Sequence, residues 1–212
     1  MDDIRKLVKG FKRFRRNYFT SDEVLFDQLR HGQKPKVLLI GCSDSRVDPA
    51  ILTDCQPGDL FVVRNVANLI PPYEPDARYH GVSSAIEYAV LFLQVEHIIV
   101  MGHSHCGGID ALMRSSAESQ VGEFIDHCVE IARPAKEIVQ RDLSDKTFDM
   151  QARACEQASI MISLENLLTF PWLADRVRDE KLALHGWYFD LQAGQMLGYH
   201  PETGEFEKLT VQ

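Results

Sequence analysis

The segment Val37-Leu38-Leu39-Ile40-Gly41-Cys42-Ser43-Asp44-Ser45-Arg46 indicates both the fold of this chain and the place of its site. Four consecutive apolar residues followed by a polar turn predict a buried strand, and Cys42 lies where that strand ends. A second apolar run, Ile98 to Met101, leads into His103-Ser104-His105-Cys106. Because ligand sites gather at the carboxyl ends of the strands in open α/β sheets, we expect these two segments to meet at one edge of a sheet.

Cys42, His103 and Cys106 supply two thiolates and one imidazole at these strand ends. Structural zinc sites use four protein ligands, whereas a Cys2His set leaves one position open for water or substrate. The sequence therefore predicts a catalytic site with one Zn2+ per chain and hydrolytic or hydrating chemistry. Burial as a small hydrophobic side chain is the alternative for any cysteine. We assign it to Cys55, Cys128 and Cys155.

Composition favours an enzyme with a small substrate. The 212 residues are 45% hydrophobic, which suits one α/β domain, and no apolar stretch is long enough to span a bilayer. The net charge of -8 argues against nucleic acid as the main partner. The chain has no CxxC redox motif and shows no secretory signal, so we expect reduced thiols in the cytoplasm and no membrane association.

Short apolar runs alternate with longer amphipathic segments, which predicts a mostly parallel central sheet with helices on both faces. A helix up to about Arg30 is expected after Thr20-Ser21-Asp22-Glu23, which has the pattern of a capping box. The expected strands are 36–40, 60–63, 97–101, 182–190 and 195–199, with a turn at Ala193-Gly194 before the last. The expected helices are 82–94, 122–141 disturbed by Pro134, and 150–168.

Two motifs together identify a family resemblance. Gly41-Cys42-Ser43-Asp44-Ser45-Arg46-Val47 and Gly102-His103-Ser104-His105-Cys106-Gly107-Gly108 resemble the β-class carbonic anhydrases of the bacterial and plant-like type. The resemblance covers nearly the whole chain and continues through residues 58–68, 85–90 and 184–187. It implies a zinc-dependent lyase that hydrates carbon dioxide reversibly to bicarbonate and a proton, by attack of a zinc-bound hydroxide.

Asp44 and Arg46 are the expected catalytic residues. A carboxylate beside the metal can accept the hydroxide proton and aim the oxygen at the substrate carbon, and an arginine can hold that carboxylate ionised. The alternative is an Asp–Arg pair that merely ties down the loop. Members of the family also show a closed form in which this aspartate fills the fourth zinc position, and lower pH is expected to favour that form.

The resemblance also implies a substrate pocket. Gln33 matches a substrate-positioning amide, and the apolar wall matches Phe61, Val66 and Tyr88, although ordinary packing would account for each residue taken alone. Gly107 and Gly108 open a helix, where backbone N–H groups can approach bicarbonate. Because the family builds this pocket from two subunits, a homodimer or a higher even homo-oligomer is expected.

Residues 1–34 are expected to form an N-terminal helical arm, and residues 35–212 the zinc-binding α/β core. In the arm, Ile4, Leu7, Val8, Phe11 and Phe14 recur at helical spacing among seven basic residues. A membrane-surface helix is the less favoured interpretation. Members of the family extend such helices across a neighbouring subunit, so packing on a partner is the prediction.

His105 is a possible proton shuttle, because histidine titrates near neutral pH and each hydration releases one proton. A solvent-facing histidine without a role is the alternative. A subset of the family binds regulatory bicarbonate beside a tryptophan, but here Leu39 occupies that position. Arg64 of that pocket is retained, while Tyr188-Phe189 departs from the common aromatic order. We therefore expect a normally open enzyme.

Three other functions stay open at this point. Hydrolysis of carbon disulfide or carbonyl sulfide would use the same zinc ligands. A non-catalytic scaffold stabilised by zinc would not need Asp44 or Arg46, and both are present. A thiol oxidoreductase would require Cys42 and Cys106 to be reactive and free of metal.

Overall fold

The structure is a computed structural model that describes residues 2–19, 25–76, 79–115 and 122–210. It divides into two compact units, Met1–Lys34 and Pro35–Gln212. The first unit contains α1 (Asp2–Phe19) and α2 (Leu25–Leu29), and the ring of Phe26 contacts rings of α1 at centroid distances of 4.7 to 5.6 Å. The predicted capping box at 20–23 lies outside the described residues.

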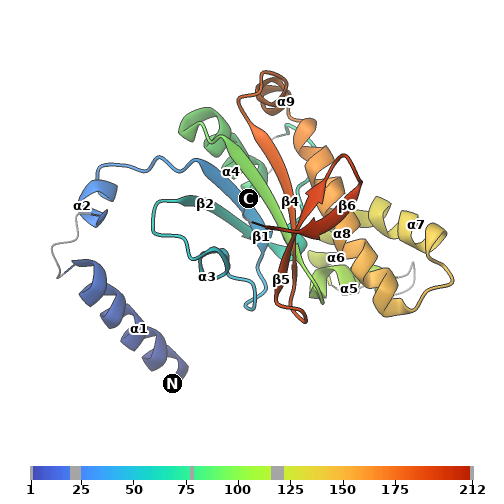
Figure 1. The fold of residues 1–212 in the computed structure, drawn as a ribbon, viewed down its shortest axis with the longest axis horizontal. Helices are drawn as coiled ribbons and strands as arrows, with labels where there is room; N and C mark the ends of the chain where they lie inside the picture. Colours follow the sequence, from blue (N-terminus) through green and yellow to red (C-terminus); the bar gives the residue numbers. More distant parts are fainter. Residues whose placement is uncertain (1, 20–24, 77–78, 116–121, 211–212) are drawn as a thin grey trace. The chain divides into compact units, whose positions relative to one another are not determined.

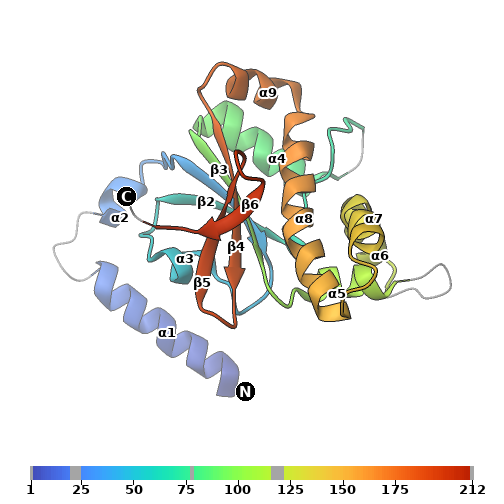
Figure 2. The ribbon, with the colours of Figure 1, turned by 45° about the vertical axis from the view of Figure 1, so that its right-hand side comes forward.

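A six-stranded sheet with the order β2-β1-β3-β4-β5-β6 organises the second unit (Figures 1 and 2). Its first four strands are parallel, and the last two pair in antiparallel fashion. The mixed α/β architecture and the mostly parallel sheet are therefore confirmed. The strands are β1 (Val37–Cys42), β2 (Leu60–Asn65), β3 (His97–His103), β4 (Ala183–Asp190), β5 (Gln195–His200) and β6 (Glu205–Lys208).

The helices flank this sheet. The segment predicted as one helix over 122–141 is three pieces, because Pro134 has no N–H to continue a helix and stands instead in the first turn of α7. No helix in the described part of the chain is long and apolar enough to cross a membrane. The helical elements are α3 (Pro49–Thr53), η1 (Val66–Asn68), α4 (Gly81–Glu87), η2 (Tyr88–Leu93), α5 (Gly107–Arg114), α6 (Ile125–Val129), η3 (Glu130–Ala132), α7 (Arg133–Asp142), α8 (Phe148–Leu168) and α9 (Pro171–Arg178).

The largest core cluster lies between one face of the sheet and the helices α4, α8 and α9. Leu38 and Ile98 point to this face, because alternate strand residues face the same side, and they pack with Ile160 of α8. The opposite face carries a smaller cluster around Leu39 and Ile99. A third cluster surrounds the carboxyl ends of the strands and includes residues of α5 and α7.

Two glycines let α8 lie close to the sheet. A Cβ added at Gly102 would be 2.8 Å from Ile160 Cδ1, and one at Gly186 would be 3.1 Å from Ile160 Cγ2. A larger side chain at either position would force Ile160 or the helix to move. The close packing of α8 on β3 brings the amino-terminal half of α8 next to the loop that follows β3.

Candidate metal centre and active site

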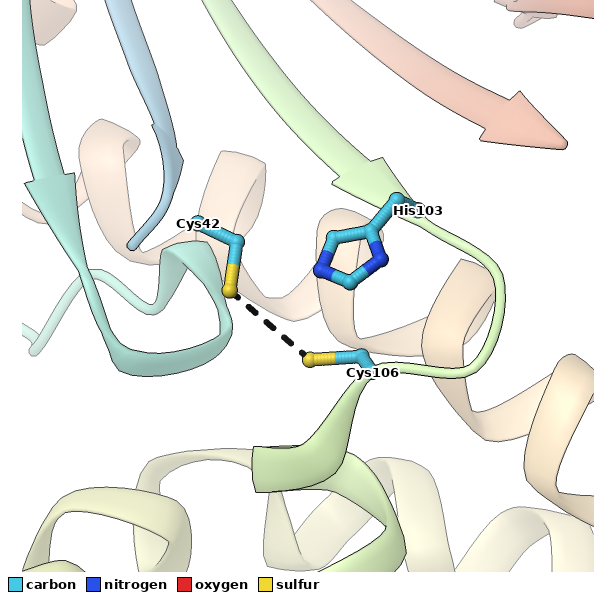
Figure 3. A group of neighbouring side chains, drawn as sticks. All are labelled: Cys42, His103 and Cys106. Atoms are coloured by element: carbon cyan, nitrogen blue, oxygen red, sulfur yellow. Dashed lines mark hydrogen bonds between the residues drawn. The ribbon is translucent and has the colours of Figure 1, made fainter. Parts of the chain in front are cut away.

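Three buried donors converge where β1 and β3 end. Cys42 is the last residue of β1, His103 the last of β3, and Cys106 precedes α5. The two sulfur atoms are 4.0 Å apart, and the ligand atoms of all three residues lie within 4.8 Å of one another (Figure 3). Sulfur and nitrogen atoms at these separations suit a tetrahedral zinc ion.

The imidazole of His103 is oriented for metal binding. Its Nδ1 lies 2.9 Å from the carbonyl oxygen of Ser104, which can only accept, so Nδ1 carries the hydrogen. The lone pair is then on Nε2, which is buried and has no hydrogen-bond partner among the described residues. A buried polar atom without a partner requires an explanation, and a metal ion at this position supplies one.

The two thiols differ in acidity. The hydrogen bond between the two thiols lowers the pKa of Cys42, against the opposing effect of burial. The same contact raises the pKa of Cys106, because that thiol keeps the shared proton, whereas the backbone N–H groups of Ile109 and Gly108 act in the opposite direction. A thiolate at Cys42 is the form that binds zinc.

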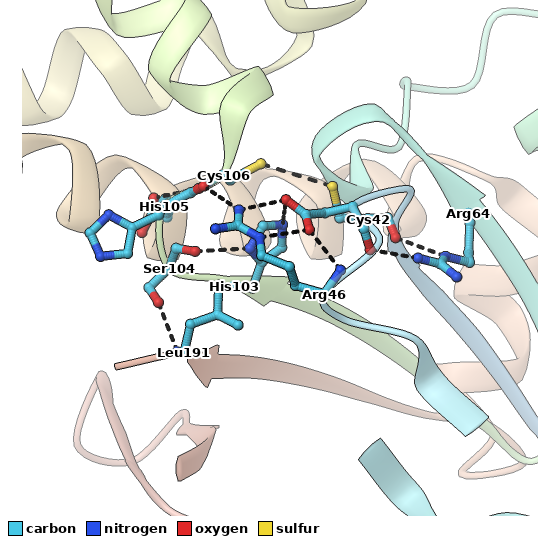
Figure 4. A network of polar contacts seen from close by, with 10 residues as sticks. Cys42, Arg46, Arg64, His103, Ser104, His105, Cys106 and Leu191 are labelled. Atoms are coloured by element: carbon cyan, nitrogen blue, oxygen red, sulfur yellow. Dashed lines mark hydrogen bonds and ion pairs between the residues drawn. The ribbon is translucent and has the colours of Figure 1, made fainter. Parts of the chain in front are cut away.

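Asp44 lies beside the three donors and is held by Arg46. The Nε and Nη2 atoms of Arg46 donate to the two carboxylate oxygens at 2.9 and 2.6 Å, and its backbone N–H donates to Oδ1 at 2.9 Å. These hydrogen bonds keep the pKa of Asp44 well below its usual range. Asp44 Oδ2 is 4.0 Å from His103 Nε2. Arg46 also donates to the carbonyl oxygen of His105 at 2.9 Å, which joins the two ligand loops (Figure 4).

Arg64 fastens the first ligand loop from the other side. It donates to the carbonyl oxygens of Cys42 and Asp44 at 2.9 and 2.7 Å, and to the carboxylate of Asp48 at 2.8 Å. All three nitrogens of the guanidinium are therefore occupied. Leu39 is fully buried in the small core cluster. The doubt about regulatory bicarbonate binding, which arose from Leu39 at the tryptophan position, stays a prediction.

Two predicted pocket residues, Gly108 at the start of α5 and Val66 in η1, lie close together. A Cβ on Gly108 would be 2.8 Å from Val66 Cγ1 and 3.0 Å from the Cβ of Ala67, whereas a Cβ on Gly107 would meet nothing within 4 Å. Ala67 has a left-handed backbone with φ of 61° and is fully buried, so it has little room to move. Gly108 is therefore required by close approach to η1, and Gly107 is not.

The remaining predicted pocket residues lie elsewhere in the chain. The rings of Phe61 and Tyr88 are 5.9 Å apart. Phe61 pairs with Leu38, four residues before Cys42 along β1, which corresponds to about 13 Å of strand. Gln33 belongs to the first unit. The substrate roles of these residues stay predictions.

His105 has a left-handed backbone, with φ of 56°, and an exposed side chain. Its ring points away from Arg46 (Figure 4) and lines a cavity of about 280 Å³ on the other side of the loop, with Arg153 and Glu156. The proton-shuttle role stays a prediction.

Glu156 was not singled out in the sequence, yet it contacts a metal-ligand residue. Its carboxylate is buried, which raises its pKa, and it accepts hydrogen bonds from the Cys106 N–H at 3.0 Å and the Tyr188 hydroxyl at 2.7 Å. The sequence did contain one indication: in the predicted helix over 150–168, Glu156 is four residues before Ile160 and therefore lies on the same helix face as this apolar residue.

Comparison with known proteins places the chain in a family. Residues 37–196 match the family model described as carbonic anhydrase. Beta carbonic anhydrase 3 of Arabidopsis thaliana is 37% identical over 92% of this chain and 76% of its own length. The chain belongs to the β-carbonic anhydrase family. This membership supports carbonic anhydrase activity, and the family's dependence on zinc agrees with the Cys42, His103 and Cys106 group.

Other β-carbonic anhydrases give the same assignment. The chloroplastic beta carbonic anhydrase 5 of Arabidopsis thaliana is 42% identical over 89% of this chain, which spans 61% of that longer protein. The solved structure of the β-carbonic anhydrase CcaA has a TM-score of 0.92 at 34% identity and covers 100% of this chain and 94% of that chain. A structure from a study of two tetrameric β-carbonic anhydrases of Sordaria macrospora has a TM-score of 0.75 at 29% identity, covering 92% and 93% of the two chains.

The glycine pair permits a matched test. We expect Gly108→Ala to lower the free energy of unfolding by about 1 to 3 kcal/mol, because the added methyl forces Val66 and Ala67 to move. Gly107→Ala adds the same methyl group to open space and should change that value by less than about 0.5 kcal/mol. Urea unfolding at one protein concentration measures both. Equal effects of the two substitutions would contradict the close contact at Gly108.

Proposed function

We propose that this protein catalyses the reversible hydration of carbon dioxide to bicarbonate and a proton, using one Zn2+ per chain bound by Cys42, His103 and Cys106. One observation carries the proposal: three buried donors converge, and an ionised Asp44 lies 4.0 Å from His103 Nε2. Three protein ligands leave a tetrahedral ion one position for water. A scaffold stabilised by zinc would have no use for a carboxylate held at that place.

Zinc, when bound, supplies a Lewis acid that lets water lose a proton near neutral pH. Asp44 accepts a hydrogen bond from the reacting water and directs its lone pair toward the carbon of carbon dioxide. Arg46 keeps that carboxylate ionised and oriented through its hydrogen bonds. Asp44 would have to break them before it could itself become a ligand, so we propose that the protein is normally open.

Purified protein of known zinc content should hydrate carbon dioxide in a stopped-flow assay with a pH indicator. Removal of the metal with a chelator should abolish the activity, and added Zn2+ should restore it, because the thiolates and the imidazole have no catalytic role without the ion. Absence of hydration with one zinc per chain would contradict the proposal, and carbonyl sulfide and carbon disulfide would then be tested. Rapid thiol labelling of Cys42 and Cys106 in the zinc-loaded protein would instead favour a thiol oxidoreductase.

Asp44→Asn should lower kcat by about 100- to 10,000-fold, because an amide cannot accept the proton as a carboxylate does. Zinc content should stay at one per chain, since Asp44 is not among the three ligands of the open site. Asp175→Asn removes a carboxylate from the exposed ion pair with Arg178 on α9 and serves as the control. Undiminished activity of Asp44→Asn would exclude a catalytic role for this carboxylate.

We also propose that the active unit is a homo-oligomer in which copies meet along β2. This strand is at the edge of the sheet. Beside it, the rings of Tyr88 and Phe92 stack at a centroid distance of 5.5 Å and are 46% and 71% exposed, and exposed apolar surface of this kind marks interfaces. Phe61 lies far along the strand from Cys42, and Tyr88 lies against Phe61, so both would line the pocket of a neighbouring copy.

The exposed apolar side chains of α1, which include Ile4 and Phe11, would pack on the same partner.

The five cysteines are free thiols, which fits a reducing compartment such as the cytoplasm.

Phe92→Asp should reduce the mass measured by light scattering, because a carboxylate cannot be buried unpaired at an apolar interface. Phe124→Asp alters an equally apolar ring that is 84% exposed on another part of the surface, and it should leave the mass unchanged. An unchanged mass for Phe92→Asp would contradict an interface along β2.

A further inference from the structure

We infer that Glu156 is a positioning residue for the Cys106 ligand, and that Tyr188 holds Glu156 in place. This inference rests on the proposed zinc site. Glu156 touches neither substrate nor metal in this arrangement. It acts through the backbone of Cys106, whose N–H donates to Glu156 Oε1 at 3.0 Å.

Burial makes this contact consequential. The exposed fraction of Glu156 is 5%, and that of Cys106 is 1%. A buried carboxylate is costly unless its oxygens are hydrogen-bonded. Each oxygen of Glu156 has one partner, since Oε1 accepts from Cys106 and Oε2 accepts from the Tyr188 hydroxyl at 2.7 Å. Removal of the carboxylate would take the acceptor away from both donors.

Cys106 needs an external acceptor because of its place in the chain. It is the residue before the first turn of α5, where N–H groups have no acceptor within the helix. Its φ of -72° and ψ of 117° turn the chain from the loop into the helix and aim its Sγ at Cys42. An acceptor on the Cys106 N–H therefore constrains the direction of the sulfur.

The loop cannot hold this shape by itself. His105 has a left-handed backbone, which is unfavourable for a residue with a side chain. Contacts from outside the loop hold its residues: the Ser104 N–H donates to the Phe189 carbonyl at 3.0 Å, and Arg46 donates to the His105 carbonyl. Glu156 provides the corresponding contact for Cys106, the ligand residue of this loop.

Glu156 is in turn held rigidly. Ile160, one turn further along α8, packs against Gly102 of β3, so the helix position is set by the sheet. Tyr188 of β4 is fully buried, pairs with Gly102 in the strand register, and lies under the guanidinium of Arg153 at 5.5 Å. Glu156 thus makes the position of the Cys106 thiolate depend on how α8 lies against β3 and β4.

Zinc affinity measured against a competing chelating dye tests the inference. Glu156→Ala should weaken zinc binding by about 10- to 100-fold, as expected when a group that orients a metal ligand is lost. Tyr188→Phe should weaken it in the same direction. Glu156→Gln keeps an acceptor for the Cys106 N–H and should lose less. Glu165→Ala, an exposed glutamate on the same helix, is the matched control and should bind zinc like the wild type.

The absorption spectrum of the Co2+-substituted protein gives a second readout, because cobalt–thiolate bands report the sulfur geometry. Altered bands in Glu156→Ala with rescue by Glu156→Gln would support positioning over general stabilisation. Wild-type affinity and spectra in both Glu156→Ala and Tyr188→Phe would overturn the inference. If circular dichroism shows that Glu156→Ala does not fold, Tyr188→Phe and Glu156→Gln decide. A zinc-loaded wild type that fails to hydrate carbon dioxide would refute the proposed function and leave this comparison intact.

Discussion

The parallel pairing of β1 with β3 is the constraint on which the site depends. It places the ends of the two strands side by side, with Gly41 opposite Met101, so that Cys42 and His103 follow at one edge of the sheet. Antiparallel pairing would send these residues to opposite edges. The rest of the site is built around these two strand ends: the Asp44–Arg46 pair follows Cys42, and the turn after His103 brings Cys106 back to Cys42.

Three charged residues then hold the loops that leave the strands. Arg64 binds the carbonyl groups of the first loop, Arg46 joins the two loops, and Glu156 binds the second. Loops carry few contacts of their own and are the most mobile parts of most folds, so such external hydrogen bonds are what give a metal site on loops a defined geometry. Arg46 and Glu156 have different roles. Arg46 keeps the Asp44 carboxylate ionised beside the ligand atoms, while the buried Glu156 accepts a hydrogen bond from the Cys106 N–H.

Sequence patterns predicted the strands and helices whose own residues show a clear hydrophobic run or a helix-breaking proline. The strands around Leu38 and Ile98 were evident as apolar runs, and Pro134 marked the interruption between η3 and α7. The predictions were incomplete where a signal depends on the environment. α9 and β6 are short and lack strong periodicity. Phe61 and Tyr88 matched a family pocket, yet in one chain Phe61 pairs with Leu38, four residues of strand before Cys42, and Tyr88 lies against Phe61. Glu156 looks like any other acidic residue of an amphipathic helix.

The sequence by itself determined the ligand types, their order and the strand ends that carry them, because a cysteine or histidine after an apolar run is a local feature. It also specified the Asp44 and Arg46 pair, which are two residues apart. The tertiary structure decided what reaches across the chain: the approach of the three ligand atoms to within 4.8 Å, the three hydrogen bonds of Arg64, and the contact of Glu156 with Cys106 fifty residues away. The Glu156 contact depends on how closely α8 packs on β3, where Ile160 of α8 lies against Gly102.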